Sequence, residues 1–188
     1  MIEIEYKFPV DDLKKIHNTI VSNGYKIAKD RRYEISIMYD NESGLMQKTN
    51  GRIRLRKSGD EAEFCYKKPI SDKNIKKEIE YEVEVSDFDT LKKIISEMQF
   101  FESSSYERYR TEYRKGEVKV TIDEYPFGSY VEIEGEENKI LEEAKDLGFD
   151  LSENQTEPCD TLFLKWRKAH GLGFKPHMRF EDYKSIES

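Results

Sequence analysis

The sequence has little cysteine and no long apolar run. Cys65 and Cys159 are the only cysteines among 188 residues, and they form no CxxC spacing. A disulfide framework and a zinc site are therefore not expected, and a reducing compartment fits this cysteine usage. No apolar run approaches the roughly 20 residues of a membrane span. Residues 1–5 have neither the basic start nor the apolar stretch of a secretion signal. These features predict a cytoplasmic protein without a membrane partner.

Positive charge is in the minority. The chain has 32 Lys and Arg against 39 Asp and Glu, which gives a net charge of −7. Broad nucleic-acid binding usually requires an overall basic footprint, so this balance argues against a nucleic-acid partner. It does not argue against a small polyanion, because the local arrangement of charge decides such binding and a metal ion can invert the local field. The 10 Phe and 12 Tyr residues indicate a folded chain.

No linker or low-complexity segment divides the chain, so one domain over residues 1–188 is predicted. The tripeptide Glu-Ile-Glu occurs at residues 3–5, 78–80 and 132–134, and a helical pattern follows each copy. Asp11 and Gly24 are the predicted N-cap and C-cap residues of the first helix. Asp87 precedes the second helix, and the third covers residues 140–148. A last helix is predicted from about Cys159 to Lys168, and an irregular tail from His170 onward.

The other segments alternate polar and apolar residues with a period of two, which is typical of strands. Short turns at residues 58–60 and 115–116 join some of them, which favours antiparallel pairing. The predicted strands are 2–9, 25–40, 51–58, 61–68, 76–85, 105–114, 117–125 and 129–135.

The polar faces of these strands are almost entirely charged, and the charges segregate by strand. Arg52, Arg54 and Arg56 share one face, and four glutamates from residue 78 to residue 84 share another. An ordinary sheet with one wet face is one interpretation. However, like charges along one face are unfavourable unless something compensates them.

A sheet that curls with its charged faces inward supplies that compensation. Helices would cover the apolar outer face, and the interior would become a hydrated tunnel with acidic and basic walls. Clustered carboxylates are natural ligands for Mg²⁺ or Mn²⁺. Arginine and lysine opposite them suit phosphate oxygens. A complex of metal and polyphosphate would satisfy both walls.

Six motifs follow one another along residues 1–165. They are Glu3-Ile4-Glu5-Tyr6-Lys7, Arg52-Ile53-Arg54-Leu55-Arg56, Phe64-Cys65-Tyr66-Lys67-Lys68-Pro69, Glu78-Ile79-Glu80-Tyr81-Glu82, Arg108-Tyr109-Arg110-Thr111-Glu112-Tyr113, and the stretch from Val120 to Glu134 that ends in Glu132-Ile133-Glu134. In this order they resemble the motifs of the CYTH family, also called triphosphate tunnel metalloenzymes. The family includes class IV adenylyl cyclases and thiamine triphosphatases. One departure is Lys68, which stands where the family has glycine.

The resemblance implies an α+β fold, an eight-stranded antiparallel β-barrel with a charged interior and helices packed outside. It also implies roles for individual residues. The implied metal ligands are Glu3, Glu5, Asp123, Glu132 and Glu134, with Glu80 or Glu82 added from the central strand. The implied phosphate-binding residues are Lys7, Arg54, Arg56, Lys67 and Arg110, with Arg52 and Arg108 as further candidates. The implied catalytic residues are Glu3, Glu5, Lys67 and Asp123, of which Asp123 ligates metal or orients water.

A second departure lies near residue 160, where the family often has a Ser-Tyr pair that this chain lacks. Two interpretations of Asp160 remain, a helix cap or a polar role at the tunnel end, and the cap is favoured. Trp166 is expected to pack beside Phe163. No role is assigned to the three histidines, and a homodimer remains open.

Three functions fit these motifs. The first is hydrolysis of tripolyphosphate, thiamine triphosphate or a nucleoside triphosphate, with Mg²⁺ or Mn²⁺ as cofactor. The second is a class IV-like adenylyl cyclase that converts ATP to cyclic AMP and pyrophosphate. The third is a non-catalytic polyphosphate-binding module. Some class IV cyclases keep only the first glutamate of the Glu132-Ile133-Glu134 motif, so the presence of both favours hydrolysis.

Overall fold

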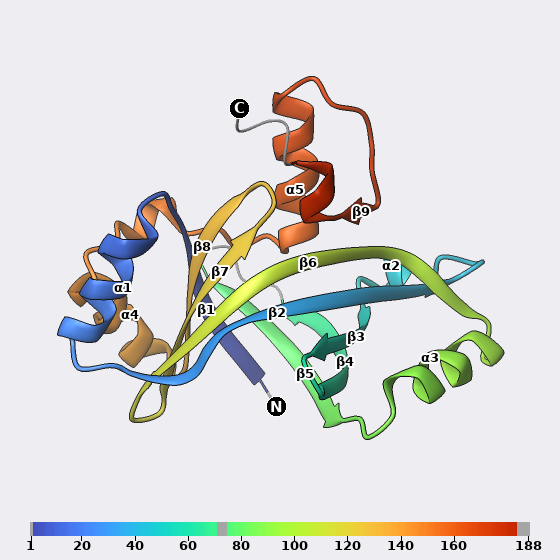
Figure 1. Cartoon of the computed structure of the whole chain (residues 1–188), viewed down its shortest axis with the longest axis horizontal. Coiled ribbons are helices and arrows are strands. Elements are labelled where there is room, and N and C mark those ends of the chain that lie inside the picture. Colours follow the sequence, from blue (N-terminus) through green and yellow to red (C-terminus); the bar gives the residue numbers. More distant parts are fainter. Residues whose placement is uncertain (1, 71–74, 184–188) are drawn as a thin grey trace.

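The computed structural model describes residues 2–70 and 75–183 and contains a closed barrel (Figure 1). Its strands are β1 (Ile2–Val10), β2 (Lys26–Asn41), β3 (Arg52–Ser58), β4 (Glu61–Ile70), β5 (Lys76–Glu84), β6 (Phe100–Lys115), β7 (Val118–Tyr125) and β8 (Gly128–Glu134). They are hydrogen-bonded in the order β2-β3-β4-β5-β1-β8-β7-β6, and an antiparallel β2–β6 pairing closes the circle. The predicted eight-stranded antiparallel barrel is therefore confirmed.

The helices lie outside this barrel. They are α1 (Leu13–Ser22), α2 (Leu45–Thr49), α3 (Phe88–Glu97), α4 (Glu137–Asp146) and α5 (Cys159–Ala169). In Figure 1, α1 and α4 lie together at one side, α3 lies at the opposite side, and α5 lies above β6 and β8. The short helix α2 was not predicted. None of the described helices combines the length and the apolar character that crossing a bilayer requires.

The predicted cap of α1 is wrong by one residue. Asp12 is the N-cap, and its side chain accepts a hydrogen bond from the backbone N–H of Lys15 at 2.9 Å. This spacing is what an N-cap needs, because the side chain must reach the N–H three residues ahead. At the other end, Asn23 is the C-cap and Gly24 follows it with φ +87, a conformation that favours glycine.

The apolar faces of the strands point outward, as the sequence pattern predicts. On β1, β7 and β8, the side chains of Phe8, Val120, Val131 and Ile133 are fully buried. They pack in one cluster with residues of α1 and α4. A second cluster joins Leu55 of β3 to Ile95 of α3. The hydrophobic core therefore lies between the barrel and its helices, which leaves the inner face free for charged side chains.

The described part of the tail after α5 has no helix or strand over residues 171–176, as the sequence predicts, but two short elements that were not predicted follow. Strand β9 (His177–Met178) pairs in parallel with β6, and a short 3-10 helix covers Phe180–Asp182. Met178 and Tyr183 are buried in a cluster with Phe163. A two-residue strand has no periodicity for a sequence pattern to reveal. The last five residues of the predicted tail lie outside the described residues.

Trp166 belongs to the same cluster, which confirms its predicted packing role. Its ring centroid lies 6.3 Å from that of Phe127 and 5.6 Å from that of Tyr183. The cluster fastens α5 and the tail to the β7–β8 end of the barrel.

This packing predicts a large effect for one substitution. Phe163 is 3% exposed, so Phe163→Ala should lower the free energy of unfolding by roughly 3–5 kcal/mol. Phe174 is 79% exposed in the same part of the chain, so Phe174→Ala should change it by less than about 0.5 kcal/mol. Urea denaturation of both variants checks this. Equal stabilities would show that α5 and the tail lie outside the cooperative core.

Candidate functional site

A cavity of about 1380 Å³ occupies the interior of the barrel. The inward side chains of all eight barrel strands line it, as the shared parity of the charged residues predicts. The predicted site residues that line it are Glu3, Glu5, Lys7, Arg52, Arg54, Arg56, Lys67, Glu80, Glu82, Arg108, Arg110, Glu132 and Glu134.

Asp123 is the predicted site residue that does not line this cavity. It is fully buried on β7. The guanidinium group of Arg108 contacts one of its carboxylate oxygens at 3.1 Å, and Arg110 forms two further hydrogen bonds to it. Asp123 shares the inward face of β7 with Lys119 and Tyr125, which line the cavity, but the two arginines contact it and it is itself fully buried.

Three carboxylates meet at the β1–β8 boundary. Glu5 lies opposite Glu134 in the strand register, and Glu3, two residues earlier, lies on the same face of β1. Carboxylate oxygens from Glu3, Glu5 and Glu134 all lie within 4.8 Å of one another. Burial raises the pKa of Glu134, and the neighbouring charges of Glu3 and Glu5 add to this effect against that of Lys119.

Lysines partly neutralise this carboxylate triad. The ammonium group of Lys67 lies 2.6 Å from Glu3, and that of Lys76 lies 3.0 Å from Glu5. Burial opposes ionisation of Glu3, but Lys67 and Lys76 hold its pKa down to about 2. Oε1 of Glu5 is buried and lies 3.1 Å from the ammonium group of Lys7 and 3.0 Å from that of Lys76. The three carboxylates together form a compact oxygen donor set, and burial disfavours the charge of Glu134, so the set fits a hard divalent cation.

The basic wall begins on β3. Arg54 and Arg56 both contact Glu63 of β4 at 2.7 Å, and Arg54 also contacts Glu82 of β5 at 3.3 Å. Burial opposes ionisation of Glu63, but the two arginines lower its pKa to about 2. Burial, together with the adjacent Glu63, raises the pKa of Glu82 to about 7. Glu82 therefore keeps its proton to a higher pH than Glu63 does.

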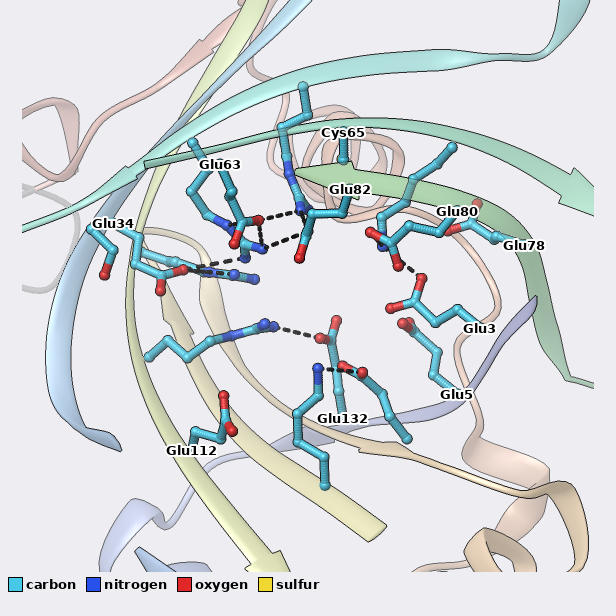
Figure 2. Close-up of a pocket in the computed structure, with 18 of the residues that line it drawn as sticks. Glu3, Glu5, Glu34, Glu63, Cys65, Glu78, Glu80, Glu82, Glu112 and Glu132 are labelled. Carbon is cyan, nitrogen blue, oxygen red and sulfur yellow. Dashed lines mark hydrogen bonds and ion pairs between the residues drawn. The ribbon is translucent and has the colours of Figure 1, made fainter. Parts of the chain in front are cut away.

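The basic wall continues on β6. Arg108 binds Glu34 of β2 with two nitrogen atoms, at 2.8 Å and 2.7 Å. Arg110 contacts Glu132 of β8 at 2.5 Å. Lys7 lies between Glu5 and Glu132, at 3.1 Å and 3.2 Å. In Figure 2, Glu34 and Glu63 lie on the opposite side of the cavity from Glu3 and Glu5.

Several lumen residues were missed by the sequence analysis. Glu34, Glu63 and Lys76 all line the cavity and pair with predicted site residues. Glu78, to which the sequence analysis gave no role, also lines the cavity and forms ion pairs with Arg52 and with Lys76. Strand parity could have found Glu63, because it shares a face with Lys67. No family motif covers Glu34, and its pairing with Arg108 depends on the closure of the barrel.

The start of α5 borders one end of the cavity. Pro158, Cys159 and Asp160 line it, and Pro158 is the N-cap residue. The expectation that Asp160 caps this helix is wrong, because Asp160 lies inside the first turn, where its side chain accepts from the backbone N–H of Thr161 at 2.7 Å. The side chain of Asp160 is available to the tunnel end instead.

Comparison with known proteins identifies the family to which this fold belongs. The family model described as the CYTH domain matches residues 1–157. The chain belongs to the CYTH family. A Methanocaldococcus jannaschii protein, provisionally named adenylate cyclase MJ0240, is 27% identical over an alignment of 154 residues, and the match covers 78% of this chain and 87% of that relative.

Two solved structures show the same fold as this CYTH chain. A provisional adenylate cyclase from Vibrio parahaemolyticus superposes with a TM-score of 0.78 at 14% identity, covering 87% of this chain and 98% of that one. A protein from Hippeastrum, described as a provisional adenylyl cyclase with a dominant triphosphatase activity, has a TM-score of 0.60 at 16% identity. That comparison covers 95% of this chain and 99% of the Hippeastrum chain.

The Glu63–Glu82 pair predicts a pH effect on stability. The pKa of Glu82 rises in the folded state from 4.5 to about 7, so the folded protein binds this proton more tightly than the unfolded chain. The resulting stabilisation of the folded state is complete below pH 4.5 and is lost as the pH rises through about 7. In Glu82→Gln, which has no carboxyl group at this position, the free energy of unfolding should not show this decrease.

Urea denaturation of metal-free protein at several pH values measures the effect. The stability difference between the native protein and Glu82→Gln should change between pH 4.5 and 7. Glu84→Gln, an exposed change on the same strand face, is the matched control. A flat difference for Glu82→Gln would contradict the raised pKa of Glu82.

Proposed function

We propose that this protein hydrolyses a triphosphate compound in its tunnel with the help of a divalent cation, Mg²⁺ or Mn²⁺. The observation that carries the proposal is that clustered carboxylates and clustered basic side chains line the same cavity. The triad of Glu3, Glu5 and Glu134 faces arginines and lysines from β3, β4 and β6 across the same lumen. Such a lumen complements a metal ion and a polyphosphate chain together, whereas an acidic or a basic cavity alone would fit only one of them.

Glu3, Glu5 and Glu134 would hold the cation, with Glu132 and a glutamate of β5 as further ligands implied by the family. When bound, the cation would neutralise phosphate charge and polarise a water molecule for attack on phosphorus. Glu132 forms ion pairs with Lys7 and Arg110. It becomes available as a ligand once those two cations turn to phosphate oxygens.

The cationic residues would bind the phosphate chain. Arg54 and Arg56 offer planar guanidinium groups that suit bidentate contact with phosphate oxygens. Lys7, Lys67 and Arg110 extend this surface toward the carboxylate triad, so they would stabilise the charge that develops on the leaving group. Arg52 and Arg108 are further ligands in the proposal. Asp123 would position Arg108 and Arg110 rather than touch the substrate, because both arginines cover it.

Binding would require an exchange of ionic partners. Arg54 contacts Glu63 and Glu82, and Lys67 contacts Glu3 and Glu80. A cation that takes the carboxylates would release the arginines and lysines, and the phosphate chain would receive them. Metal and substrate should therefore bind with positive coupling, each raising the affinity of the protein for the other.

Hydrolysis is favoured over cyclisation by two observations. The chain keeps both Glu132 and Glu134, and the Hippeastrum relative of the same fold is described with a dominant triphosphatase activity. A class IV-like adenylyl cyclase is the second candidate, supported by the provisional name of the Methanocaldococcus jannaschii relative. The proposal covers one CYTH domain over residues 1–188, a small-molecule triphosphate partner and a cytoplasmic location, which the two free cysteines suit.

One experiment separates these activities. The protein is incubated with ATP, tripolyphosphate or thiamine triphosphate, with Mg²⁺ or Mn²⁺ and after exhaustive chelation, and the products are identified. We expect release of inorganic phosphate that depends entirely on the cation, because the carboxylate triad repels a metal-free triphosphate. Cyclic AMP with pyrophosphate as the products from ATP would establish the cyclase instead. Full turnover after chelation would refute the role of the triad, and no turnover with any substrate would favour a binding module.

Two substitutions should separate metal binding from substrate binding. Glu134→Gln should weaken Mn²⁺ binding because it removes one anionic oxygen donor of the triad. It should not reduce stability, since burial disfavours the charge of Glu134. Arg54→Ala should leave Mn²⁺ binding unchanged and weaken triphosphate binding roughly ten- to a hundredfold, equivalent to about 1.5–3 kcal/mol.

Calorimetry with Mn²⁺ and kinetics with the best substrate provide the two readouts. Lys57→Ala is the matched control, because Lys57 is an exposed residue that follows Arg56 on β3 and points to the outer face. Arg54→Ala with native substrate affinity would exclude Arg54 as a phosphate ligand.

A further inference from the structure

Cys65 carries a buried thiol on the inner face of the barrel. It is 1% exposed and lines the cavity on β4. The strand register places Glu82 of β5 directly opposite it on one side and Arg54 of β3 on the other. Among the described residues, 2–70 and 75–183, no hydrogen bond to the thiol is formed. A polar side chain buried in this way without a partner is available to a ligand.

Two carboxylates converge on this thiol. Lys67 follows Cys65 on the same face of β4 and lies opposite Glu80, so Glu80 is a diagonal neighbour of Cys65. The sulfur of Cys65 and carboxylate oxygens of Glu80 and Glu82 all lie within 4.8 Å of one another. Figure 2 shows the three residues on neighbouring strands at one side of the cavity.

We propose that Cys65, Glu80 and Glu82 form a second cation site, selective for thiophilic divalent ions such as Zn²⁺, Co²⁺ or Cd²⁺. One thiolate and two carboxylates are a donor set that such ions accept, whereas Mg²⁺ and Mn²⁺ favour oxygen alone. The site differs from the triad of Glu3, Glu5 and Glu134, which offers only oxygen, and when it is occupied Glu80 and Glu82 serve this cation rather than the one at the triad. The absence of a CxxC spacing does not argue against it, because register between two strands, not sequence spacing, assembles it.

The neighbouring cations can give up the two carboxylates. Arg54 lies 3.3 Å from Glu82 but only 2.7 Å from Glu63, so it keeps its nearer partner when Glu82 turns away. Lys67 lies 2.9 Å from Glu80 and 2.6 Å from Glu3, and it keeps Glu3 in the same way. Occupation of the site therefore leaves neither Arg54 nor Lys67 as a buried unpaired charge.

The position of the site gives it an inhibitory role. A cation there would lie beside Arg54 and Lys67, two of the proposed phosphate-binding residues. It would bind Glu82 and Glu80, the carboxylates that pair with these two residues. Thiophilic cations should therefore inhibit turnover at concentrations where Mg²⁺ supports it. This consequence depends on the proposed function, whereas the binding of the cation does not.

Absorption spectroscopy with Co²⁺ tests the binding without any turnover. Metal-free, reduced protein is first saturated with Mg²⁺ to fill the oxygen-only triad and is then titrated with Co²⁺. Bound Co²⁺ gives a thiolate-to-metal charge-transfer band in the near ultraviolet only if sulfur is a ligand. We expect this band in the native protein and in Cys159→Ser, and we expect its loss in Cys65→Ser. Cys159 is the matched control because it is the other cysteine that lines the cavity.

A second variant tests the carboxylate part of the site. Glu82→Gln should keep the band and weaken Co²⁺ binding by about tenfold or more, since even outer-sphere partners affect metal affinity on this scale. Thermal melts of all variants show whether each one is folded. The proposal is overturned if the native protein shows no band, if the band requires Cys159, or if folded Glu82→Gln binds Co²⁺ with native affinity. Failure of the triphosphatase assay would leave the spectroscopic result unchanged, so the two proposals fail separately.

Discussion

The structure depends on the pairing of charges that have been removed from water. Moving one ion out of water costs several kcal/mol even after relaxation, and an adjacent opposite charge must offset this cost. Arg110 illustrates the solution, because it joins Asp123 of β7 to Glu132 of β8. Arg108 does the same between Asp123 and Glu34 of β2. The Glu34–Arg108 pair lies directly opposite in the β2–β6 register, so it bridges the seam at which the barrel closes.

The same pairing shapes what the tunnel can bind. Its cations and carboxylates already satisfy one another, so a ligand that brings only one sign of charge must leave buried partners of the other sign uncompensated. A polyphosphate with its divalent cation brings both. The lumen is therefore a set of ion pairs with two alternative arrangements, one internal and one shared with the ligand. This property explains how a chain of net charge −7 can offer a strong site for a polyanion.

Strand parity and motif order predicted much of this architecture. The alternation in residues 51–58 and 76–85 was enough to place charged side chains inside and apolar ones outside. What the sequence could not provide is contact across strands. Glu34 was missed because its partner, Arg108, lies 74 residues away and meets it only through barrel closure. Asp160 was misplaced because the extended backbone at Pro158, with ψ 154, starts α5 two residues earlier. Strand β9 is too short for any local pattern.

Lys7 connects the tunnel to the segment that leads into α5. Its ammonium group contacts the backbone carbonyl of Glu157 at 3.3 Å, and its own backbone bonds to Asn154 and Gln155 at 2.9 Å and 2.8 Å. These contacts lie beyond the last β1–β5 pair, so residues 154–155 take the place of a neighbouring strand. A displacement of α5 must therefore strain or break bonds to a side chain that also faces Glu5 and Glu132. The position of α5 at that tunnel end and the ion pairs inside the tunnel are therefore thermodynamically coupled. A ligand that binds Lys7 changes the free energy of both.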